Sequence, residues 1–262
     1  MKEQIIKELK TEWAGHTCHY FETLNSTNDY AKSLLKEGAC HGTLVVADCQ
    51  TGGKGRRGRV WETPKGTNIS MSLCLEPQLP AEKVSGLTLV AALAVARAIR
   101  ETAGTEAGIK WPNDLVLNGK KICGILTEMI FHEGHYGVVV GIGINVNNES
   151  FPESIESIAG SLKSETGKAF SREALIAIIL RYFEEAYEIY VKTGNLVKLK
   201  EAYENFLINK EKEVCVLDPK EPYRGTALGI NEDGNLRVLC ADGSVKEVWS
   251  GEVSVRGLYG YV

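Results

Sequence analysis

Two adjacent residues, Asn118-Gly119, place the strongest constraint on how this 262-residue chain can fold. They separate DLVL from KKICGILTEMIF, and apolar residues in these runs recur with a period of two. An Asn-Gly pair favours the left-handed backbone of a two-residue turn, so the runs are predicted to form an antiparallel hairpin. HEGH then leads to YGVVVGIGINVN, a further predicted antiparallel strand. A sheet with antiparallel strands is therefore expected near the centre of the fold.

Helical and extended segments are predicted on both sides of this hairpin. Residues 28–37 place their apolar side chains on one helical face, with Ser26 or Thr27 as the N-cap and Gly38 as the stop. Strands are predicted over 43–49 and 68–75, and the second should be half-buried because its apolar residues alternate with smaller or polar ones. Further helices are predicted over residues 81–103, 153–163, 171–194 and 195–206.

The composition of the chain changes near residue 212. Five short apolar runs follow, separated by EDGN, ADGS and similar turns at intervals of roughly ten residues. This spacing is typical of a small all-β barrel. The sequence therefore predicts two domains, residues 1–210 and 211–262.

Charge and cysteine content exclude several classes of protein. The formal net charge of -4 argues against binding of duplex nucleic acid through a broadly basic surface. Seven cysteines without a CxxC pair are typical of reduced thiols, which predicts a cytoplasmic protein. No secretory h-region and no apolar run long enough to span a bilayer occur, so no membrane attachment is expected.

The stretch TGGKGRRGRVW, residues 51–61, concentrates positive charge in this otherwise acidic chain. It matches GxGxxG, but a dinucleotide-binding loop must open a helix, and Pro64 and Gly66 follow too soon for one. No Walker A string occurs. Two interpretations remain: a solvated basic hairpin tip, or a mobile loop whose glycines approach a small anion that the cations hold.

A second polar stretch, KWPNDLVLNGKKICG, covers residues 110–124. The Trp-Pro pair opposes helix, so Asn113 and Asp114 should begin a strand and point into a cleft. Lys120 and Lys121 must point to opposite faces of their strand. Lys121 leads the apolar run ICGIL and is the better functional candidate, whereas Lys120 is expected in solvent. Gly124 permits close approach of a ligand or of backbone.

Together with STN at 26–28, these stretches closely resemble the biotin protein ligases. The resemblance rests on five strings in the family order: STN, Gln50 with GKGRRGR and Trp61, KWPND, KICGIL with Glu128, and GIGIN at 141–145. It implies an α+β fold with a catalytic domain like that of class II aminoacyl-tRNA synthetases, in which a mixed or antiparallel sheet carries helices on one side. The C-terminal domain is implied to be an SH3-like β-barrel.

The resemblance also implies a reaction in two steps. Biotin and MgATP give biotinyl-5'-AMP and pyrophosphate, and a lysine of a biotin carboxyl carrier protein then attacks the mixed anhydride. ATP and Mg²⁺ are thus a co-substrate and an ion, biotin is a substrate, and no tightly bound cofactor is implied.

Site residues are carried over onto matching positions. Arg56 and Lys121 are the expected catalytic residues, because protonated groups must screen a carboxylate from a phosphate. Biotin is expected to contact Ser26, Thr27, Asn28, Gln50, Lys54, Gly55, Arg56, Lys121 and Gly124. Nucleotide contacts are expected from Arg56, Arg57, Arg59, Trp61, Asn113 and Asn145. Asp114 is a candidate for orienting Mg²⁺ from its second shell, and Glu252 and Arg256 are candidates for contacting the nucleotide or the carrier.

Several alternatives stay open from the sequence. Trp61 is equally interpretable as a core residue, and Asn145 as a turn residue. Lys54 replaces the first loop arginine of the family and loses its bidentate geometry, which puts a ligand contact of its side chain in doubt. Lipoate ligase or octanoyltransferase activity and a non-enzymatic nucleic-acid-binding module are the other functions considered.

Regulation and assembly are less constrained by the sequence. About 25 residues precede STN, too few for the N-terminal winged helix-turn-helix of some relatives. A monofunctional ligase without sequence-specific DNA binding is therefore expected. Homodimerisation through a sheet edge is an open alternative for which the sequence defines no interface.

Overall fold

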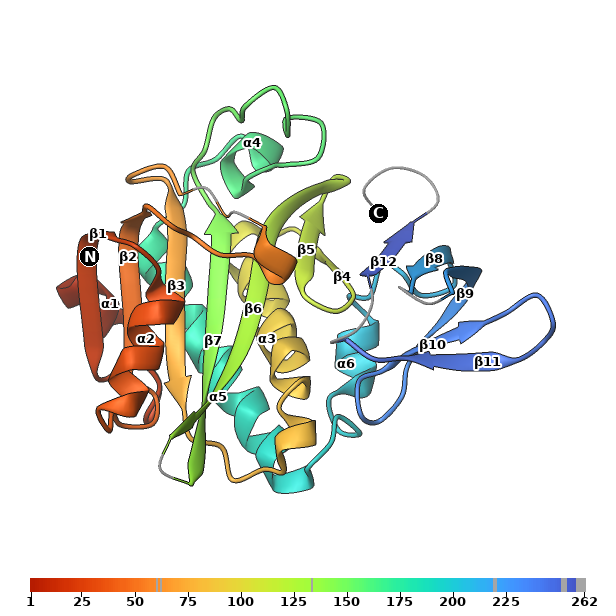
Figure 1. The fold of residues 1–262 in the computed structure, drawn as a ribbon. Helices are drawn as coiled ribbons and strands as arrows, with labels where there is room; N and C mark the ends of the chain where they lie inside the picture. Colours follow the sequence, from red (N-terminus) through yellow and green to blue (C-terminus); the bar gives the residue numbers. More distant parts are fainter. Residues whose placement is uncertain (60, 62, 133, 219–220, 251–253, 258–262) are drawn as a thin grey trace.

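A computed structural model describes the chain except for residues 60, 62, 133, 219–220, 251–253 and 258–262. A large sheet backed by helices forms most of the molecule, and a small sheet lies beside one edge of it (Figure 1). The α+β class is therefore confirmed. The described residues include no helix with the length and apolar character needed to cross a membrane.

The large sheet has seven strands in the order β1-β2-β3-β7-β6-β5-β4. Only β1 and β2 are parallel, and every other neighbouring pair in this sheet is antiparallel. The strands are β1 (Cys18–Leu24), β2 (Leu44–Gln50), β3 (Asn68–Leu75), β4 (Gly108–Lys110), β5 (Asp114–Leu117), β6 (Lys120–His132) and β7 (His135–Asn145). The predicted hairpin turn joins β5 to β6, with φ of 50° at Asn118 and 80° at Gly119.

Helices cover both faces of this sheet. Helix α2 (Thr27–Lys36) packs on one face, where Ala31 and Leu35 meet Val45, Cys74 and Val139. On the other face lie α3 (Gly86–Ala103) and α5 (Arg172–Thr193) (Figure 1). The family resemblance implied helices on one side of the sheet only. Helix α2 departs from that expectation, and it is the helix nearest the functional site. The remaining helices are α1 (Lys2–Glu8), α4 (Leu162–Thr166), α6 (Lys200–Glu204) and the 3₁₀ turns η1 (Arg56–Gly58) and η2 (Ala81–Lys83).

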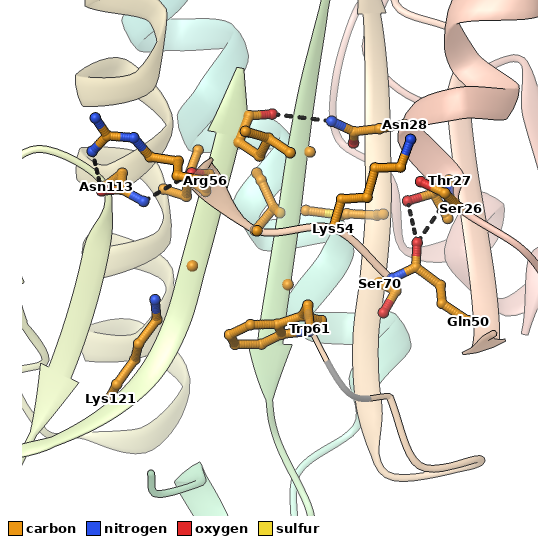
Figure 2. A pocket seen from close by; sticks show the side chains of 18 residues that line it. Ser26, Thr27, Asn28, Gln50, Lys54, Arg56, Trp61, Ser70, Asn113 and Lys121 are labelled. Carbon is orange, nitrogen blue, oxygen red and sulfur yellow. Dashed lines mark hydrogen bonds between the residues drawn. The ribbon is translucent and has the colours of Figure 1, made fainter. Parts of the chain in front are cut away.

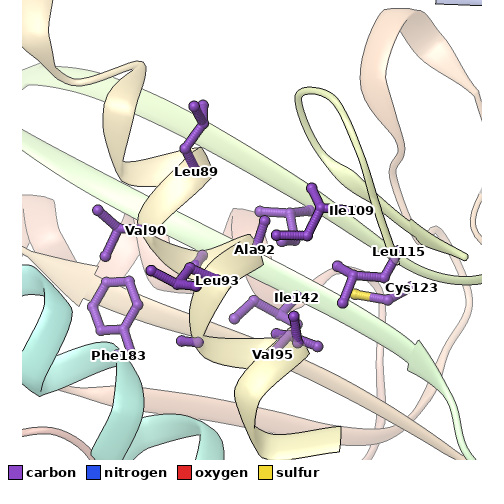
Figure 3. Packing of buried hydrophobic residues seen from close by; sticks show 14 of the residues in the cluster. Leu89, Val90, Ala92, Leu93, Val95, Ile109, Leu115, Cys123, Ile142 and Phe183 are labelled. Carbon is purple, nitrogen blue, oxygen red and sulfur yellow. The ribbon is translucent and has the colours of Figure 1, made fainter. Parts of the chain in front are cut away.

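The main core fills the space between the sheet and the α3–α5 layer. Apolar side chains along α3 pack against strand residues such as Ile142 and against Phe183 of α5 (Figure 3). Strand β3 is buried along its whole length, so the prediction of a half-buried strand was wrong. Its apolar residues face this core, while Ser72 meets the N-terminal turn of α2 on the opposite face. The polar residues that alternate with the apolar ones along β3 are therefore covered by α2 and not exposed to water.

The small C-terminal sheet is antiparallel, with strand order β11-β10-β9-β8-β12. All five predicted strands are present: β8 (Glu213–Leu217), β9 (Tyr223–Ile230), β10 (Leu236–Leu239), β11 (Val245–Val248) and β12 (Ser254–Gly257). Among the described residues no pairing closes β11 onto β12. The boundary near residue 210 stays a prediction.

Trp111 fixes the small sheet beside the large one. Its indole Nε1 donates to the carbonyl of Gly234 at 2.9 Å, and its backbone N–H donates to Oδ1 of Asn209 at 2.8 Å. The indole is 2% exposed, so both polar contacts are shielded from water. The turn between β4 and β5 is thereby held against the C-terminal domain, next to the pocket described below.

Four segments differ from the prediction. The parallel strand β1 and helix α1 were not predicted. Residues 153–163 were expected to be helical, but α4 begins only at Leu162, after a capping box at Ser161. The preceding segment bonds instead to the backbone of Lys121, whose N–H donates to Ile158 O at 2.8 Å and whose carbonyl accepts from Gly160 N at 3.0 Å. The helix expected over 195–206 is reduced to α6 by turns at its start.

The seven cysteines are all free thiols, and their reactivity should follow burial. Burial raises the pKa of the Cys74 thiol to about 12 and also raises that of Cys123. We expect an aromatic disulfide reagent at mildly alkaline pH to modify exposed Cys40 first and to modify Cys74 and Cys123 only after unfolding. Peptide mass spectrometry checks the order, and rapid labelling of Cys123 in the folded protein would contradict it.

Candidate active site

A pocket opens on the α2 face of the large sheet, beneath the glycine-rich loop (Figure 2). The side chains leave a cavity of about 50 Å³. Its lining comes from the start of α2, the loop, the turn between β4 and β5, and strands β2, β3, β6 and β7. The lining residues are Ser26, Thr27, Asn28, Gln50, Lys54, Gly55, Arg56, Trp61, Ser70, Met71, Asn113, Lys121, Gly124, Ile125, Leu126, Gly141, Ile142 and Gly143.

Glycines on β6 and β7 form the floor of this pocket, and their lack of side chains leaves room for the groups above them. Gly124 and Gly143 are paired across the two strands, and the Trp61 ring lies against both. A Cβ atom at Gly143 would come within 2.6 Å of the indole, and one at Gly141 would come within 2.0 Å of Oδ1 of Asn28. Because strand residues alternate between faces, the intervening Ile142 belongs to the core on the other side. In the GIGIN string, the isoleucines therefore pack in the core and the glycines form the pocket floor.

One end of the pocket presents neutral hydrogen-bonding groups (Figure 2). Ser26 is the N-cap of α2, as predicted, and its Oγ accepts from Asp29 N at 3.4 Å. Gln50, the last residue of β2, accepts at Oε1 from the backbone N–H and the hydroxyl of Thr27, at 2.8 and 3.0 Å. These bonds fix hydroxyl and amide groups around one end of the cavity, where the one charged residue of the described lining, Lys54, is paired with Asp29.

The glycine-rich loop folds back on itself across the pocket. Trp61 N donates to Gly53 O at 3.0 Å, and Gly55 N donates to Arg59 O at 2.7 Å. A Cβ atom at Gly53 would lie 2.2 Å from the carbonyl oxygen of Trp61, so only glycine permits this close approach. The turn itself passes through Arg57, which has a φ of 59°. This fold brings Arg56 to the pocket.

The other end of the pocket is cationic, with Arg56 and Lys121 on the same side as Asn113 (Figure 2). Arg56 donates to Asn113 Oδ1 at 2.8 Å and also to the carbonyl of Ser250 in the C-terminal domain. Burial, together with the nearby Arg57 and Arg59, lowers the pKa of the Arg56 guanidinium, and Asp114 opposes this shift. A bound anion at this end would offset part of the cost of burying the guanidinium.

Lys121 is held by a carboxylate and lies beside an indole. Its Nζ atom is 2.6 Å from Oδ1 of Asp114 and 5.7 Å from the centroid of the Trp61 ring. Asn113 donates to the same carboxylate oxygen at 3.2 Å and to the carbonyl of Ile125 at 3.1 Å. Asp114 therefore orients the ammonium group that faces the cavity. The described residues contain no group of three His, Cys, Asp or Glu side chains that could hold a metal ion.

Trp61 was interpreted from the sequence either as a ligand contact or as a core residue, and its position has features of both. Its ring is partly buried on the glycine floor, yet it lines the cavity. Its Nε1 is buried without a hydrogen-bond partner among the described residues. An unpaired buried donor is costly, so this atom is available to an acceptor that enters the pocket.

The other predicted site residues lie away from the lining. Arg57 and Arg59 are exposed on the loop. Asn145 is 7% exposed and bonds to Asn68 and to the carbonyl of Gly160, at 3.3 and 3.0 Å, which is a structural arrangement. Glu252 lies outside the described residues, and Arg256 is placed only as a residue of β12.

Ser70, Gly141 and Gly143 line the pocket but were not predicted as site residues from the sequence. A signal for the two glycines was present, since they alternate with isoleucine in a predicted strand. Ser70 has no such signal, because its position depends on the pairing of β3 with β7, which is remote in sequence.

Replacing Gly143 with alanine is expected to weaken biotin binding about tenfold, since the added methyl group must displace the Trp61 ring from the floor. Isothermal titration calorimetry with biotin measures the change. The midpoint of thermal unfolding should move little, because the residue faces a cavity. Unchanged affinity would show that the Trp61 position has no part in binding.

Comparisons with known proteins agree with this geometry, and matches to protein families identify the class of enzyme. Residues 20–145 match the biotin/lipoate A/B protein ligase family, and residues 211–256 match the biotin protein ligase C-terminal domain. The bifunctional ligase/repressor BirA of Bacillus subtilis is 40% identical over 257 residues, which cover 97% of this chain and 78% of that protein. The corresponding protein of Escherichia coli is 31% identical over 253 residues, covering 95% of this chain and 77% of that protein.

Similar solved structures narrow the family assignment from biotin/lipoate ligases to biotin protein ligases. Biotin protein ligase from Aquifex aeolicus in complex with biotin and ATP superposes with a TM-score of 0.82 at 31% identity, covering 92% of this chain and 99% of that one. The chain belongs to the biotin protein ligases. This establishes the enzyme class and agrees with the α+β fold, in which a large mixed sheet is followed by a small antiparallel C-terminal sheet.

Proposed function

We propose that this pocket condenses biotin with ATP to give biotinyl-5'-AMP and then transfers the biotinyl group to a lysine of a biotin carboxyl carrier protein. The observation that carries the proposal is the distribution of groups in the pocket. Arg56 and Lys121 lie at one end, whereas the other end presents neutral hydrogen-bonding groups and Lys54, whose charge is paired with Asp29. Biotin has the matching polarity, since its ureido ring is neutral and its carboxylate is anionic. Ser26, Thr27, Asn28 and Gln50 would bind the ring.

Arg56 and Lys121 would act on the reacting anions. A carboxylate oxygen of biotin attacks the α-phosphorus of ATP, and pyrophosphate leaves. Both reactants are anionic, so their repulsion must be screened in the transition state. Arg56 currently donates to two neutral acceptors, Asn113 and Ser250. A carboxylate or phosphate is a stronger acceptor, and we propose that it draws the guanidinium away from them.

The second step needs the adenylate to survive until a carrier lysine arrives. The lysine amine attacks the acyl carbon, an amide bond forms, and AMP leaves. Water would compete for the same carbon. The loop over residues 51–63, with Trp61 on the pocket floor, would exclude it. The other proposed contacts of the nucleotide are those expected from the sequence: Arg57, Arg59, Trp61, Asn113 and Asn145.

No group of three His, Cys, Asp or Glu side chains among the described residues could hold a metal ion by itself. Asp114 already pairs with Lys121, whose ammonium group repels a second cation. Mg²⁺ characteristically binds through substrate phosphates with few protein carboxylates. We therefore propose that the ion enters on ATP.

Location and assembly remain proposals too. The free state of all seven cysteines supports a cytoplasmic location. Dimerisation through an edge strand of the large sheet stays a prediction without an interface.

Exchange of labelled pyrophosphate into ATP tests the proposed function. Exchange that requires biotin and does not occur with lipoate or octanoate supports it, and biotinylation of an apo carrier domain tests the second step. Exchange with lipoate in place of biotin would favour a lipoate ligase. Absence of exchange, combined with salt-sensitive retention of nucleic acid on filters, would favour a nucleic-acid-binding module.

A further inference from the structure

Lys54 ties the glycine-rich loop to the first turn of α2. Its Nζ atom lies 2.8 Å from Oδ1 and 2.6 Å from Oδ2 of Asp29. The ammonium group therefore has an anionic partner within the protein, although Lys54 lines the pocket. The sequence comparison left the role of this side chain open, because lysine replaces arginine here.

The ion pair continues into the body of the site. Lys32 lies 2.9 Å from Oδ1 of Asp29 and 2.8 Å from Oε1 of Glu128 on β6. Oε2 of Glu128 accepts from Nδ2 of Asn28 at 2.8 Å, and Asn28 lines the cavity. The loop is thus connected through α2 to the floor of the pocket.

Lys54 and Arg56, two of the side chains that anchor the loop, differ in one respect. Arg56 is held by neutral acceptors, so an anionic substrate can displace them. Lys54 is held by a carboxylate, so the same substrate competes less well for its ammonium group. After Arg56 has turned to the ligand, the ion pair of Lys54 with Asp29 still anchors the loop.

We propose that Asp29 is a positioning residue that, through Lys54, holds residues 51–63 over the bound adenylate. The inference rests on the proposed function, since it assigns the loop a protective task in that reaction. Burial alone would raise the pKa of Asp29, but hydrogen bonds and charge from Lys54 and Lys32 outweigh it and lower the pKa. The carboxylate is therefore ionised at neutral pH.

The size of the effect follows from exposure. The side chains of Lys54 and Asp29 are 48% and 34% exposed, and ion pairs of this kind change equilibria by small factors. We expect Asp29→Asn to raise KM for biotin about threefold and to shorten the lifetime of enzyme-bound adenylate about threefold. Turnover at saturating substrate and the midpoint of thermal unfolding should stay unchanged, because neither the reacting groups nor the core is altered.

A mutant cycle tests the contact directly. Lys54→Met should shorten the adenylate lifetime as Asp29→Asn does, and the double variant should be no worse than either single one. Lys54→Arg, which keeps the charge, should restore most of the lifetime that Lys54→Met loses. Glu22→Gln is the matched control, since Glu22 forms an exposed ion pair with Lys65, just beyond the loop, at 3.3 Å. It should change neither KM nor lifetime.

The outcomes separate the two proposals. Biotin-dependent exchange in the wild type, with unchanged adenylate lifetime in Asp29→Asn, would overturn the role of Asp29 and leave the proposed function intact. Additive effects in the double variant would also overturn the role of Asp29 without affecting the proposed function. Absence of biotin-dependent exchange in the wild type would overturn the proposed function itself, and the role of Asp29 with it.

Discussion

Lys121→Ala is expected to slow biotin-dependent pyrophosphate exchange by about 30- to 1,000-fold, or about 2 to 4 kcal/mol of transition-state stabilisation. The ammonium group lies at the cationic end of the pocket, 2.6 Å from Asp114, and its removal leaves that carboxylate facing the reacting anions. Attraction is thus replaced by repulsion. Single-turnover formation of adenylate, measured by rapid quench, separates this effect from any change in product release.

The neighbouring lysine provides a matched control. Lys120 begins the same strand, but its Nζ atom lies 4.0 Å from Glu165, outside the pocket lining. Lys120→Ala should therefore retain exchange within about twofold, because the side chain lies outside the pocket lining. Thermal unfolding of both variants shows whether the unpaired Asp114 affects stability instead. Adenylate formation at the wild-type rate in folded Lys121→Ala would remove Lys121 from the mechanism.

The largest effect on stability is expected for Glu184→Ala. Glu184 is 8% exposed on α5, and its carboxylate accepts three backbone N–H groups, from Glu12 at 2.7 Å, Trp13 at 2.9 Å and Ala14 at 2.8 Å. Alanine leaves these donors without their acceptor, which should lower the free energy of unfolding by about 3 kcal/mol. Urea denaturation followed by far-ultraviolet circular dichroism measures it.

Glu188 tests whether the buried contact carries this effect. It lies one turn further along α5, and its carboxylate accepts only a weak contact from Trp13 Nε1 at 3.4 Å among the described hydrogen bonds. Glu188→Ala should change the free energy of unfolding by less than about 0.5 kcal/mol. Equal effects of the two substitutions would indicate that α5 loses general helix stability and not a specific anchor of the N-terminal segment.

Local signals in the sequence predicted much of the fold. The Asn118-Gly119 turn, the Ser26 cap of α2 and the Ser171 cap of α5 depend on neighbours within a few residues, and the structure contains all three. The five strands of the C-terminal domain were found for the same reason. Each is bounded by turn residues close in the sequence.

Features that depend on remote partners were missed or wrong. Strand β1 is recognisable only through its parallel pairing with β2, across the intervening α2. The segment before α4 loses its expected helix to backbone bonds with Lys121. The hydrogen bond of the Asn145 side chain with Asn68 was not foreseen, because Asn68 is brought near only by the pairing of β3 with β7; the nucleotide contact expected for Asn145 stays a prediction.

The candidate site shows the same division. The motifs located the loop, the lysine and the polar end of the pocket, because each is a continuous string. They could not show that Arg56 contacts Asn113 and the C-terminal domain, or that Lys54 contacts Asp29. Those contacts join segments between 25 and 194 residues apart.

A crystal structure with biotin and a non-hydrolysable ATP analogue tests most directly whether clustered cations bring the two anions together under the loop. We predict residues 51–61 over the ligands, with Arg56 released from Asn113. Arg56 and Lys121 should each lie about 3 Å from a carboxylate or α-phosphate oxygen. A complex in which the loop points into solvent and both cations keep their present partners would contradict the mechanism.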